Sequence, residues 1–163
     1  MERLDVEELP FILAHTGVKH HSGNYHRPIR ERWLEGEKEV IQAYEEITEL
    51  ALKGKRTLLD GNWEELGRLM NENHLIQDSL NYAGNENNRL IKAALSGGAL
   101  GAKLAGAGGG GTIIALTLDK ERTRKALLEA GAEKILELDP GAKGIIVEEF
   151  DNSAVLDRNS AAD

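Results

Sequence analysis

Apolar residues near the start of the chain form one short, continuous run. Residues 10–16 are almost entirely apolar, and Gly17 closes the run, which predicts a buried strand. Residues 19–32 are basic and irregular instead. We therefore expect a loop after the strand, leading into a helix with Pro28 near its first turn.

A different spacing governs the next 50 residues. From residue 33 to residue 51, apolar side chains recur three, four and seven positions apart, with Glu and Lys between them, which predicts an amphipathic helix. We expect it to end at Gly54 or at the Asp-Gly pair that follows. A second helix is predicted through residue 80, because Asn62 and Glu65 have the spacing of a capping box.

Glycine then interrupts the helical pattern. We expect Gly84 to stop the second helix and Asn85 to cap a short third helix. Residues 97–111 hold eight glycines. The β-branched residues of 112–118 predict that a strand follows directly.

The last third of the chain adds a helix over 120–130, a short strand at 134–138 and a final strand at 144–150. This order of elements predicts an α+β fold, an antiparallel sheet of about four strands with helices packed on one face. It is a split βαβ, ferredoxin-like arrangement with extra helices. We assign residues 1–150 to one domain and expect 151–163 to be a flexible tail.

Composition narrows the class of protein. The net charge of -8 argues against a general nucleic-acid binder, which needs a basic surface. No apolar run approaches the ~20 residues that a membrane-spanning helix needs, and the acidic start is unlike a signal peptide. The absence of cysteine removes disulfides and thiolate chemistry. We expect a cytoplasmic protein that contacts neither nucleic acid nor membrane.

The glycine cluster resembles two nucleotide-binding motifs only formally. Residues 106–111 fit G-x-G-x-x-G, but that motif must open a helix, and here a strand is predicted to follow. The phosphate-loop pattern fails because Thr112 and Ile113 stand where Lys and Ser or Thr are required. Two explanations for the glycines stay open on spacing alone. They form either a tight turn that another backbone approaches closely or an anion cradle of bare amides.

Longer sequence strings resemble a known family. Residues 101–116, GAKLAGAGGGGTIIAL, resemble the third motif of the GHMP kinases, the superfamily of galactokinase, homoserine kinase, mevalonate kinase and phosphomevalonate kinase. Residues 13–18, LAHTGV, resemble the strand that opens the carboxyl-terminal domain of these kinases. Residues 70–74, MNENH, are similar to mevalonate kinases, and residues 30–36, RERWLEG, to sugar kinases of the glucuronokinase type.

The resemblance covers only the second half of such an enzyme. The first half would carry the motif P-x-x-x-G-L-x-S-S, and none of Pro10, Pro28 and Pro140 begins it. The resemblance therefore implies a carboxyl-terminal domain whose partner is the missing amino-terminal, ATP-binding domain. ATP and Mg²⁺ would lie mainly on that partner, and the chain alone would carry no catalytic residue and phosphorylate nothing.

The resemblance also assigns candidate binding residues. The cofactor phosphates would lie against the loop made of Gly106, Ala107, Gly108, Gly109, Gly110 and Gly111. Thr16 and Gly17, at the end of the opening strand, would contact the substrate. Asn73, on the inner stripe of its helix, and Lys103, just before the loop, are further candidates, although each fits an ordinary structural position equally well.

A basic segment is the last candidate. Arg30 and Arg32 are suited to an anionic acceptor, because a guanidinium binds a carboxylate through two hydrogen bonds. The alternative is a solvated surface paired to Glu31 and Glu35. We expect no metal site from the nearby histidines, including His26, because no carboxylate completes a usual spacing. His74 is expected to pack at the edge of the core rather than to act in catalysis.

The expected function is thus the carboxyl-terminal domain of an ATP-dependent kinase for a small hydroxylated metabolite. A sugar or sugar acid is the preferred acceptor, with mevalonate as the alternative. A non-catalytic module that binds a metabolite or a partner is the rival from another class. A surface that met the missing half would be apolar and exposed, and the fragment could form a homodimer through it.

Overall fold

The computed structural model describes residues 9–19 and 23–138. The expected strand at 144–150 and the tail at 151–163 lie outside these residues. The helices of the described part are α1 (Gly23–Leu34), α2 (Lys38–Leu59), α3 (Trp63–Ser79), α4 (Asn85–Ser96) and α5 (Lys120–Glu129). Its strands are β1 (Phe11–His15), β2 (Gly101–Ala105), β3 (Thr112–Leu116) and β4 (Lys134–Glu137).

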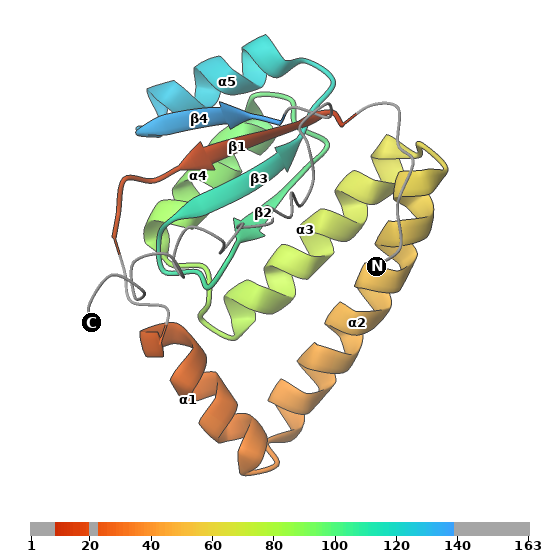
Figure 1. The fold of residues 1–163 in the computed structure, drawn as a ribbon, viewed down its shortest axis with the longest axis vertical. Coiled ribbons are helices and arrows are strands. Elements are labelled where there is room, and N and C mark those ends of the chain that lie inside the picture. The colour runs from red at the N-terminus through yellow and green to blue at the C-terminus, as the bar shows by residue number, and fades with distance from the viewer. Residues whose placement is uncertain (1–8, 20–22, 139–163) are drawn as a thin grey trace, which may run out of the picture.

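The four strands form one antiparallel sheet in the order β2-β3-β1-β4 (Figure 1). Across it, Leu13 of β1 pairs with Ile114 of β3 and Leu136 of β4, while Ile114 pairs with Lys103 of β2. Because side chains alternate along a strand, these four residues belong to one face. The α+β class and the antiparallel sheet are therefore confirmed.

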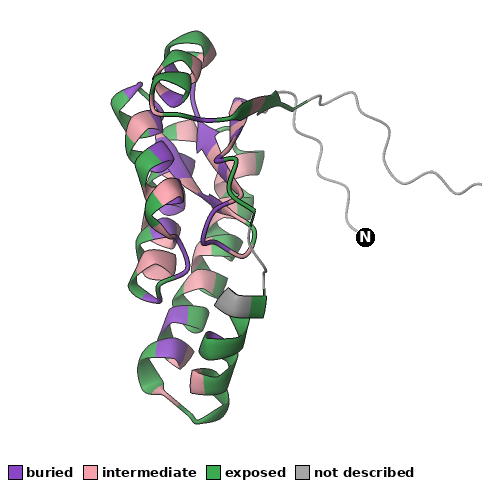
Figure 2. Ribbon diagram, turned by 90° about the vertical axis from the view of Figure 1, so that its left-hand side faces the viewer, coloured by how far each residue is buried: buried purple, intermediate pink, exposed green. Residues whose placement is uncertain are grey.

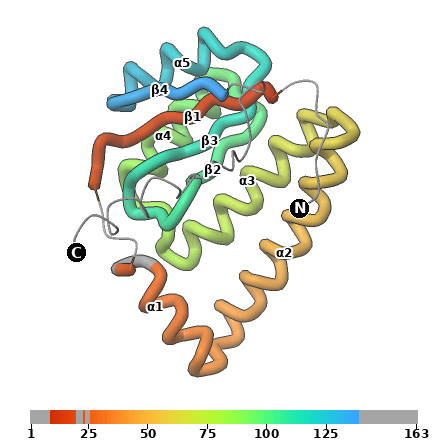
Figure 3. Tube along the Cα trace, viewed as in Figure 1, coloured from red at the N-terminus to blue at the C-terminus, as the bar shows by residue number. Residues whose placement is uncertain are grey.

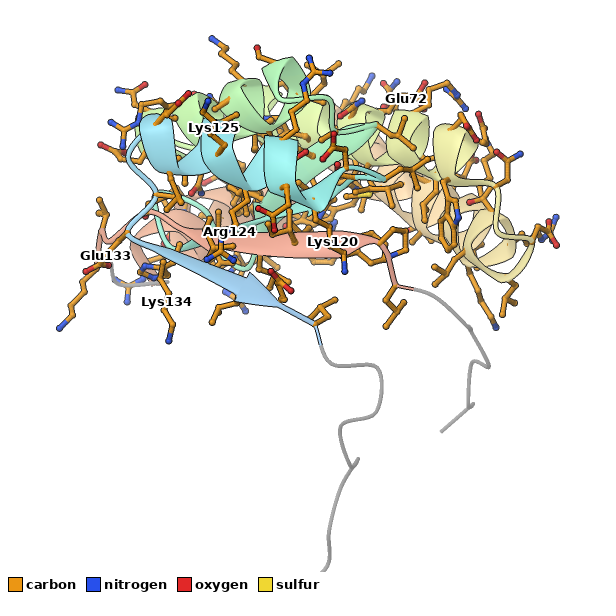
Figure 4. All side chains as sticks on the ribbon, turned by 90° about the horizontal axis from the view of Figure 1, so that it is seen from above. Glu72, Lys120, Arg124, Lys125, Glu133 and Lys134 are labelled. Atoms are coloured by element: carbon orange, nitrogen blue, oxygen red, sulfur yellow. The ribbon has the colours of Figure 1, made fainter. Side chains whose placement is uncertain are left out.

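Helices α4 and α5 cover the opposite face of the sheet (Figures 1 and 4). The core there contains Ile12 of β1, Ile113 of β3, Leu90 of α4 and Leu127 of α5, all fully buried. Each such side chain contributes roughly 1.5–3 kcal/mol through burial. Arg124 of α5 also forms an ion pair with Glu137 of β4, with its Nη1 3.2 Å from Oε1. Burial in Figure 2 is concentrated in the sheet and its covering helices, whereas α1 is mostly exposed.

Helix α3 runs along the edge formed by β2 (Figure 3). A Cβ placed on Gly101 would lie 2.3 Å from the Gly67 carbonyl oxygen, so only glycine allows the two backbones to approach so closely. The side chain of Asn71 completes this edge. Its Nδ2 donates to the Leu100 carbonyl (3.1 Å), and its Oδ1 accepts from the Ala102 N–H (3.0 Å). Asn71 thus takes the place of a neighbouring strand on β2.

The start of the first long helix differs from expectation. Trp33 belongs to α1, and the chain turns at Gly36, which has a φ of 77°, before α2 begins. Pro28 is the sixth residue of α1 rather than part of its first turn, so it costs one hydrogen bond early in the helix. Helix α2 continues through Gly54, where a Cβ would meet the nearest Leu66 atom at 3.7 Å, an ordinary contact distance. It ends at Leu59 with Asp60 as its C-cap, so the expected end at the Asp60-Gly61 pair is confirmed.

The connection from α3 to α4 also differs from expectation. Helix α3 ends at Ser79, and Asn81, with a φ of 64°, turns the chain. Gly84 does not stop α3 but serves as the N-cap of α4, with a φ of 77°, and Asn85 is the first helical residue. None of the helices in the described part of the chain is long and apolar enough to cross a membrane.

The contact between α3 and β2 can be tested with one methyl group. We expect Gly101→Ala to lower the free energy of unfolding by about 1–3 kcal/mol, because its Cβ would overlap the Gly67 backbone. Gly54→Ala adds the same methyl group to an open helical position and should be neutral or stabilising by up to about 1 kcal/mol. Urea unfolding measures both values, and equal stability of the two variants would contradict this account of the edge.

Candidate functional site

The glycine loop, residues 106–111, joins β2 to β3 and packs on the connection between α3 and α4. The Gly109 N–H donates to the carbonyls of Tyr82 (2.8 Å) and Ala83 (3.0 Å). The side chain of Asn87 donates from Nδ2 to the Gly110 carbonyl (2.9 Å). At the other end of the loop, the Gly111 carbonyl accepts from the Thr16 N–H (2.8 Å). Three segments therefore hold the loop in place.

Glycine is required here for two separate reasons. All five glycines of the loop have positive φ, between 70° and 133°, where other residues are strained. In addition, a Cβ on Gly108 would lie 1.6 Å from the Tyr82 carbonyl oxygen, and one on Gly84 would lie 3.0 Å from Gly109 Cα. Close backbone approach, one of the two explanations left open by the sequence, thus accounts for Gly108.

The first residues of the glycine loop face outward. Gly106 is exposed, and a Cβ placed there would meet no atom within 4 Å. Ala107 is half-buried, whereas Gly108, Gly109 and Gly110 are buried. The first two residues therefore form the part of the loop that a second backbone or a phosphate group can reach.

Thr16 and Gly17 lie beside this loop, as their position after β1 requires. Thr16 is buried, and its Oγ1 accepts from the Val18 N–H (3.2 Å) while its own N–H binds the loop. Gly17 is exposed with a φ of 81°, and a Cβ on it would lie 3.0 Å from the Glu133 carboxylate. The structure brings Thr16 to the loop through its backbone.

Asn73 and Lys103 come together at a second place. Both line a cavity of about 230 Å³ between α2, α3 and β2. Lys103 Nζ donates to the Leu104 carbonyl (2.9 Å), and burial lowers the pKa of this lysine. Asn73 Oδ1 is buried without a hydrogen-bond partner. Two candidates that are 30 positions apart in the sequence therefore share one site.

His74 belongs to a partly buried chain of polar groups. Its Nε2 lies 3.0 Å from Asn88 Oδ1, and Asn88 Nδ2 donates to Asp78 Oδ1 (2.8 Å). Since Asp78 can only accept when ionised, Asn88 must present its oxygen to His74, which places the histidine proton on Nε2. Nδ1 is then an acceptor, buried and unpartnered. His74 thus packs within the core, and burial lowers its pKa, with the Lys103 charge adding to the effect.

Arg30 and Arg32 of the basic segment do not line the cavity that Asn73 and Lys103 share. Arg32 pairs with Glu37 at the turn between α1 and α2, where Nε and Oε2 are 2.7 Å apart, and it lies 4.0 Å from Glu39. The side-chain hydrogen bond to Glu37 raises the pKa of Arg32. Arg30 is exposed on α1. Arg32 therefore already has carboxylate partners, although these are not Glu31 and Glu35.

Histidines of the basic segment have other surroundings. The ring of His26 packs edge-on against Tyr82, with 5.8 Å between centroids. The other two histidines of the segment, at positions 20 and 21, lie outside the described residues. Within the described ranges, no three or more His, Asp or Glu side chains gather as metal ligands would.

Sequence reasoning missed Asn87 and Tyr82, both of which hold the glycine loop. Asn87 is fully buried, and its Oδ1 has no partner. A signal was present, because Asn87 occupies the inward stripe of α4 together with Leu90, Ile91 and Ala94. An amide in an apolar stripe indicates a specific polar partner. Tyr82 contributes its backbone carbonyl, for which a sequence gives no signal.

The chain is similar in sequence to parts of known kinases. The family model for the GHMP kinase C-terminal region matches residues 47–135. A mevalonate kinase of Pyrococcus furiosus is 34% identical over 126 residues, which cover 74% of this chain and 38% of that protein. A probable glucuronokinase 2 of Arabidopsis thaliana is 33% identical over 110 residues, 65% of this chain and 30% of that protein.

A solved structure shows the same fold. The mevalonate kinase of L. major, crystallised in complex with R-mevalonate, superposes with a TM-score of 0.69 at 23% identity, covering 77% of this chain and 40% of that one. At this identity the likeness concerns the fold. The chain thus spans about 30–40% of the length of the proteins it resembles.

His74 makes stability depend on pH in a defined direction. Its pKa is lowered in the folded state from 6.5, so the unfolded chain binds the proton more readily. Stability should therefore fall as pH drops below about 6.5, by roughly 1.4 kcal/mol for each unit that separates the two pKa values. His74→Gln should lose this part of the pH dependence.

Urea unfolding at pH 7.5 and pH 5.5 measures the effect in wild type and variant. His26→Gln, which removes an exposed histidine instead, is the matched control and should behave as wild type. A wild type and a His74→Gln variant with the same pH dependence would show that the buried histidine does not resist protonation.

Proposed function

The chain belongs to the GHMP kinase C-terminal family, and on that premise we propose that it forms the carboxyl-terminal half of an ATP-dependent kinase for a small hydroxylated carboxylic acid. Two named relatives support this acceptor class, because mevalonate and glucuronate are both hydroxy acids. Of the acceptors expected from the sequence, a sugar acid and mevalonate fall within this class, whereas a neutral sugar does not. The reaction would transfer the γ-phosphoryl group of ATP to a hydroxyl of the acceptor.

The glycine loop carries the proposal. Its buried half is fixed by Tyr82, Asn87 and Thr16, and its open half at Gly106 presents backbone without a side chain. Phosphoryl transfer depends on positioning and charge stabilisation more than on covalent chemistry by the protein. A rigid loop with an open backbone face supports a role in shaping the phosphate-binding loop of the other half.

The assignment of ATP and Mg²⁺ follows from the residues present. The open backbone of Gly106 and Ala107 fits the approach of phosphate groups, and bound ATP would supply the phosphoryl group there. In the ranges that the structure describes, no three or more His, Asp or Glu side chains form a metal-binding group. On the family resemblance, we assign Mg²⁺ and most of the ATP contacts to the amino-terminal half, and this chain alone should not transfer phosphate.

The acceptor would lie between the loop and the sheet face that carries Lys103. Thr16 binds the loop through its N–H, while Lys103 and Asn73 line the cavity between α2, α3 and β2. Apolar side chains are exposed on several elements, including Leu75 of α3 (67%) and Leu136 of β4 (40%). Formation of a homodimer through such a surface stays a prediction.

Reconstitution tests the proposal. The chain is mixed with the part of the Pyrococcus furiosus mevalonate kinase that it does not match, and ADP release is followed with ATP, Mg²⁺ and either mevalonate or glucuronate. We expect no turnover from either piece and measurable turnover from the mixture. If the truncated kinase is active with its own missing piece but never with this chain, the non-catalytic module is favoured instead.

Two alanine variants separate the role of the loop from the effect of backbone strain. Gly106→Ala and Gly36→Ala both place alanine at a positive φ where a Cβ meets no atom within 4 Å, so both pay a backbone strain of about 1–3 kcal/mol. Only Gly106→Ala should abolish turnover in the mixture, because its methyl group would keep the two halves apart. Equal turnover of the two variants would refute the role of the loop.

A further inference from the structure

Tyr82 contacts the glycine loop with its backbone and two helices with its side chain. Its carbonyl accepts from the Gly109 N–H (2.8 Å), and a Cβ on Gly108 would lie 1.6 Å from the same oxygen. At the far end of the side chain, its hydroxyl lies 3.1 Å from the hydroxyl of Tyr44 on α2. Its ring also packs edge-on against His26 of α1. A single residue therefore joins the loop to α1 and α2.

Helix α1 and the first turns of α2 project away from the sheet (Figures 1 and 2). Among the residues of α1 whose burial the structure describes, only Ile29 is buried. It belongs to a core cluster with Val40 and Ala43 of α2, and this cluster also contains Tyr82 and Leu104. The position of the α1–α2 hairpin, residues 23–59, thus depends on the ring of Tyr82 and the small core around it.

The bond between the two hydroxyl groups is the polar part of this junction. Tyr82 is buried, so its hydroxyl would lose hydrogen-bond energy without the partner on α2. Burial raises the pKa of Tyr82, and the hydrogen bond to Tyr44 adds to the effect, so this hydroxyl keeps its proton at neutral pH. A tyrosine side chain has only two torsions. Fixing its hydroxyl end therefore restricts the backbone from which the ring extends.

We propose that Tyr82 is a positioning residue for the glycine loop and that Tyr44 fixes Tyr82 through the bond between their hydroxyl groups. The α1–α2 hairpin and the loop then keep one fixed relation, and a displaced hairpin would move Gly108 and Gly109. The inference deepens the proposed function, on which it rests for the role of the loop in phosphoryl transfer. In this role neither tyrosine touches a substrate, so the pair should affect the rate of transfer rather than the binding of ATP.

Hydrogen exchange of two backbone amides tests the coupling on the full chain, without the other half. Tyr44→Phe and Tyr82→Phe each remove one hydroxyl and keep the ring. We expect exchange of the Gly109 N–H to be roughly three- to tenfold faster in both variants, because one hydrogen bond of the junction is lost. Exchange of the Ala102 N–H, which Asn71 Oδ1 accepts at 3.0 Å, should not change, since this contact does not pass through Tyr82.

Two further variants separate this coupling from a general loss of stability. The double variant Tyr44→Phe/Tyr82→Phe should exchange the Gly109 N–H no faster than either single variant, because both changes remove the same bond. Thr57→Val is the matched control. It also removes a hydroxyl from α2, one that forms its hydrogen bonds within the helix, including one to the Gly54 carbonyl (3.0 Å). This control should exchange as wild type does.

Turnover of the reconstituted mixture tests the consequence for catalysis. We expect both phenylalanine variants to lower kcat by roughly tenfold and to leave the KM for ATP unchanged, whereas Thr57→Val should match wild type. Tyr44 is 39% exposed, so Tyr44→Phe carries the test even if Tyr82→Phe does not fold.

Three results would overturn the proposal. These are unchanged Gly109 exchange in Tyr44→Phe, an equal acceleration at Ala102, or a wild-type kcat of that variant in an active mixture. A mixture that shows no turnover with the wild-type chain would count against the proposed kinase half, whereas the exchange of Gly109 would still decide whether Tyr44 and Tyr82 position the loop.

Discussion

Close packing of backbone on backbone, made possible by glycine, determines where the functional parts of this chain lie. Gly67 and Gly101 bring α3 against the edge of β2, and Gly108 lies under the Tyr82 carbonyl. Both contacts act on the same short stretch, since β2 leads directly into the glycine loop. Moving either contact by the width of a methyl group would displace the loop relative to the helices that carry Asn73 and Asn87.

Side-chain amides bind backbone groups next to the two close glycine contacts. Asn71 pairs with β2 as a neighbouring strand would, and Asn87 binds the Gly110 carbonyl from a fully buried position. In each case the amide satisfies a backbone group that the close approach removes from water, and leaving such a group unpaired would cost about 1–3 kcal/mol. The two asparagines therefore specify the geometry of the loop more than they add net stability.

Local patterns were enough to predict most elements of the fold. The period of apolar residues indicated α3, α4 and α5, and the β-branched run indicated β3. The break at Gly36 was missed, because Trp33 continues the helical spacing although it belongs to α1 and is 49% exposed. The resemblance of the glycine string to a family was recognisable, because a family motif is local in sequence.

The site was less predictable, because its geometry depends on contacts between distant segments. Asn73 and Lys103 were separate candidates in the sequence, and only the packing of α3 along β2 places them on one cavity. Arg32 had the right chemistry for an anion, but Glu37, five residues away and across the turn, occupies it. Residue type thus predicts which groups could bind a ligand, whereas the tertiary partners decide which groups remain available.

The glycine loop is held in its conformation by contacts within this chain. The hydrogen bonds of Tyr82, Asn87 and Thr16 to the loop are all internal to the chain, so its conformation is set without ATP or a second domain. The entropic cost of ordering six residues, roughly 1–2 kcal/mol each, is then met during folding rather than during association. In the proposed complex, a partner that docks on Gly106 would meet a surface whose conformation is already set, and more of its contact energy would remain available for positioning phosphate groups.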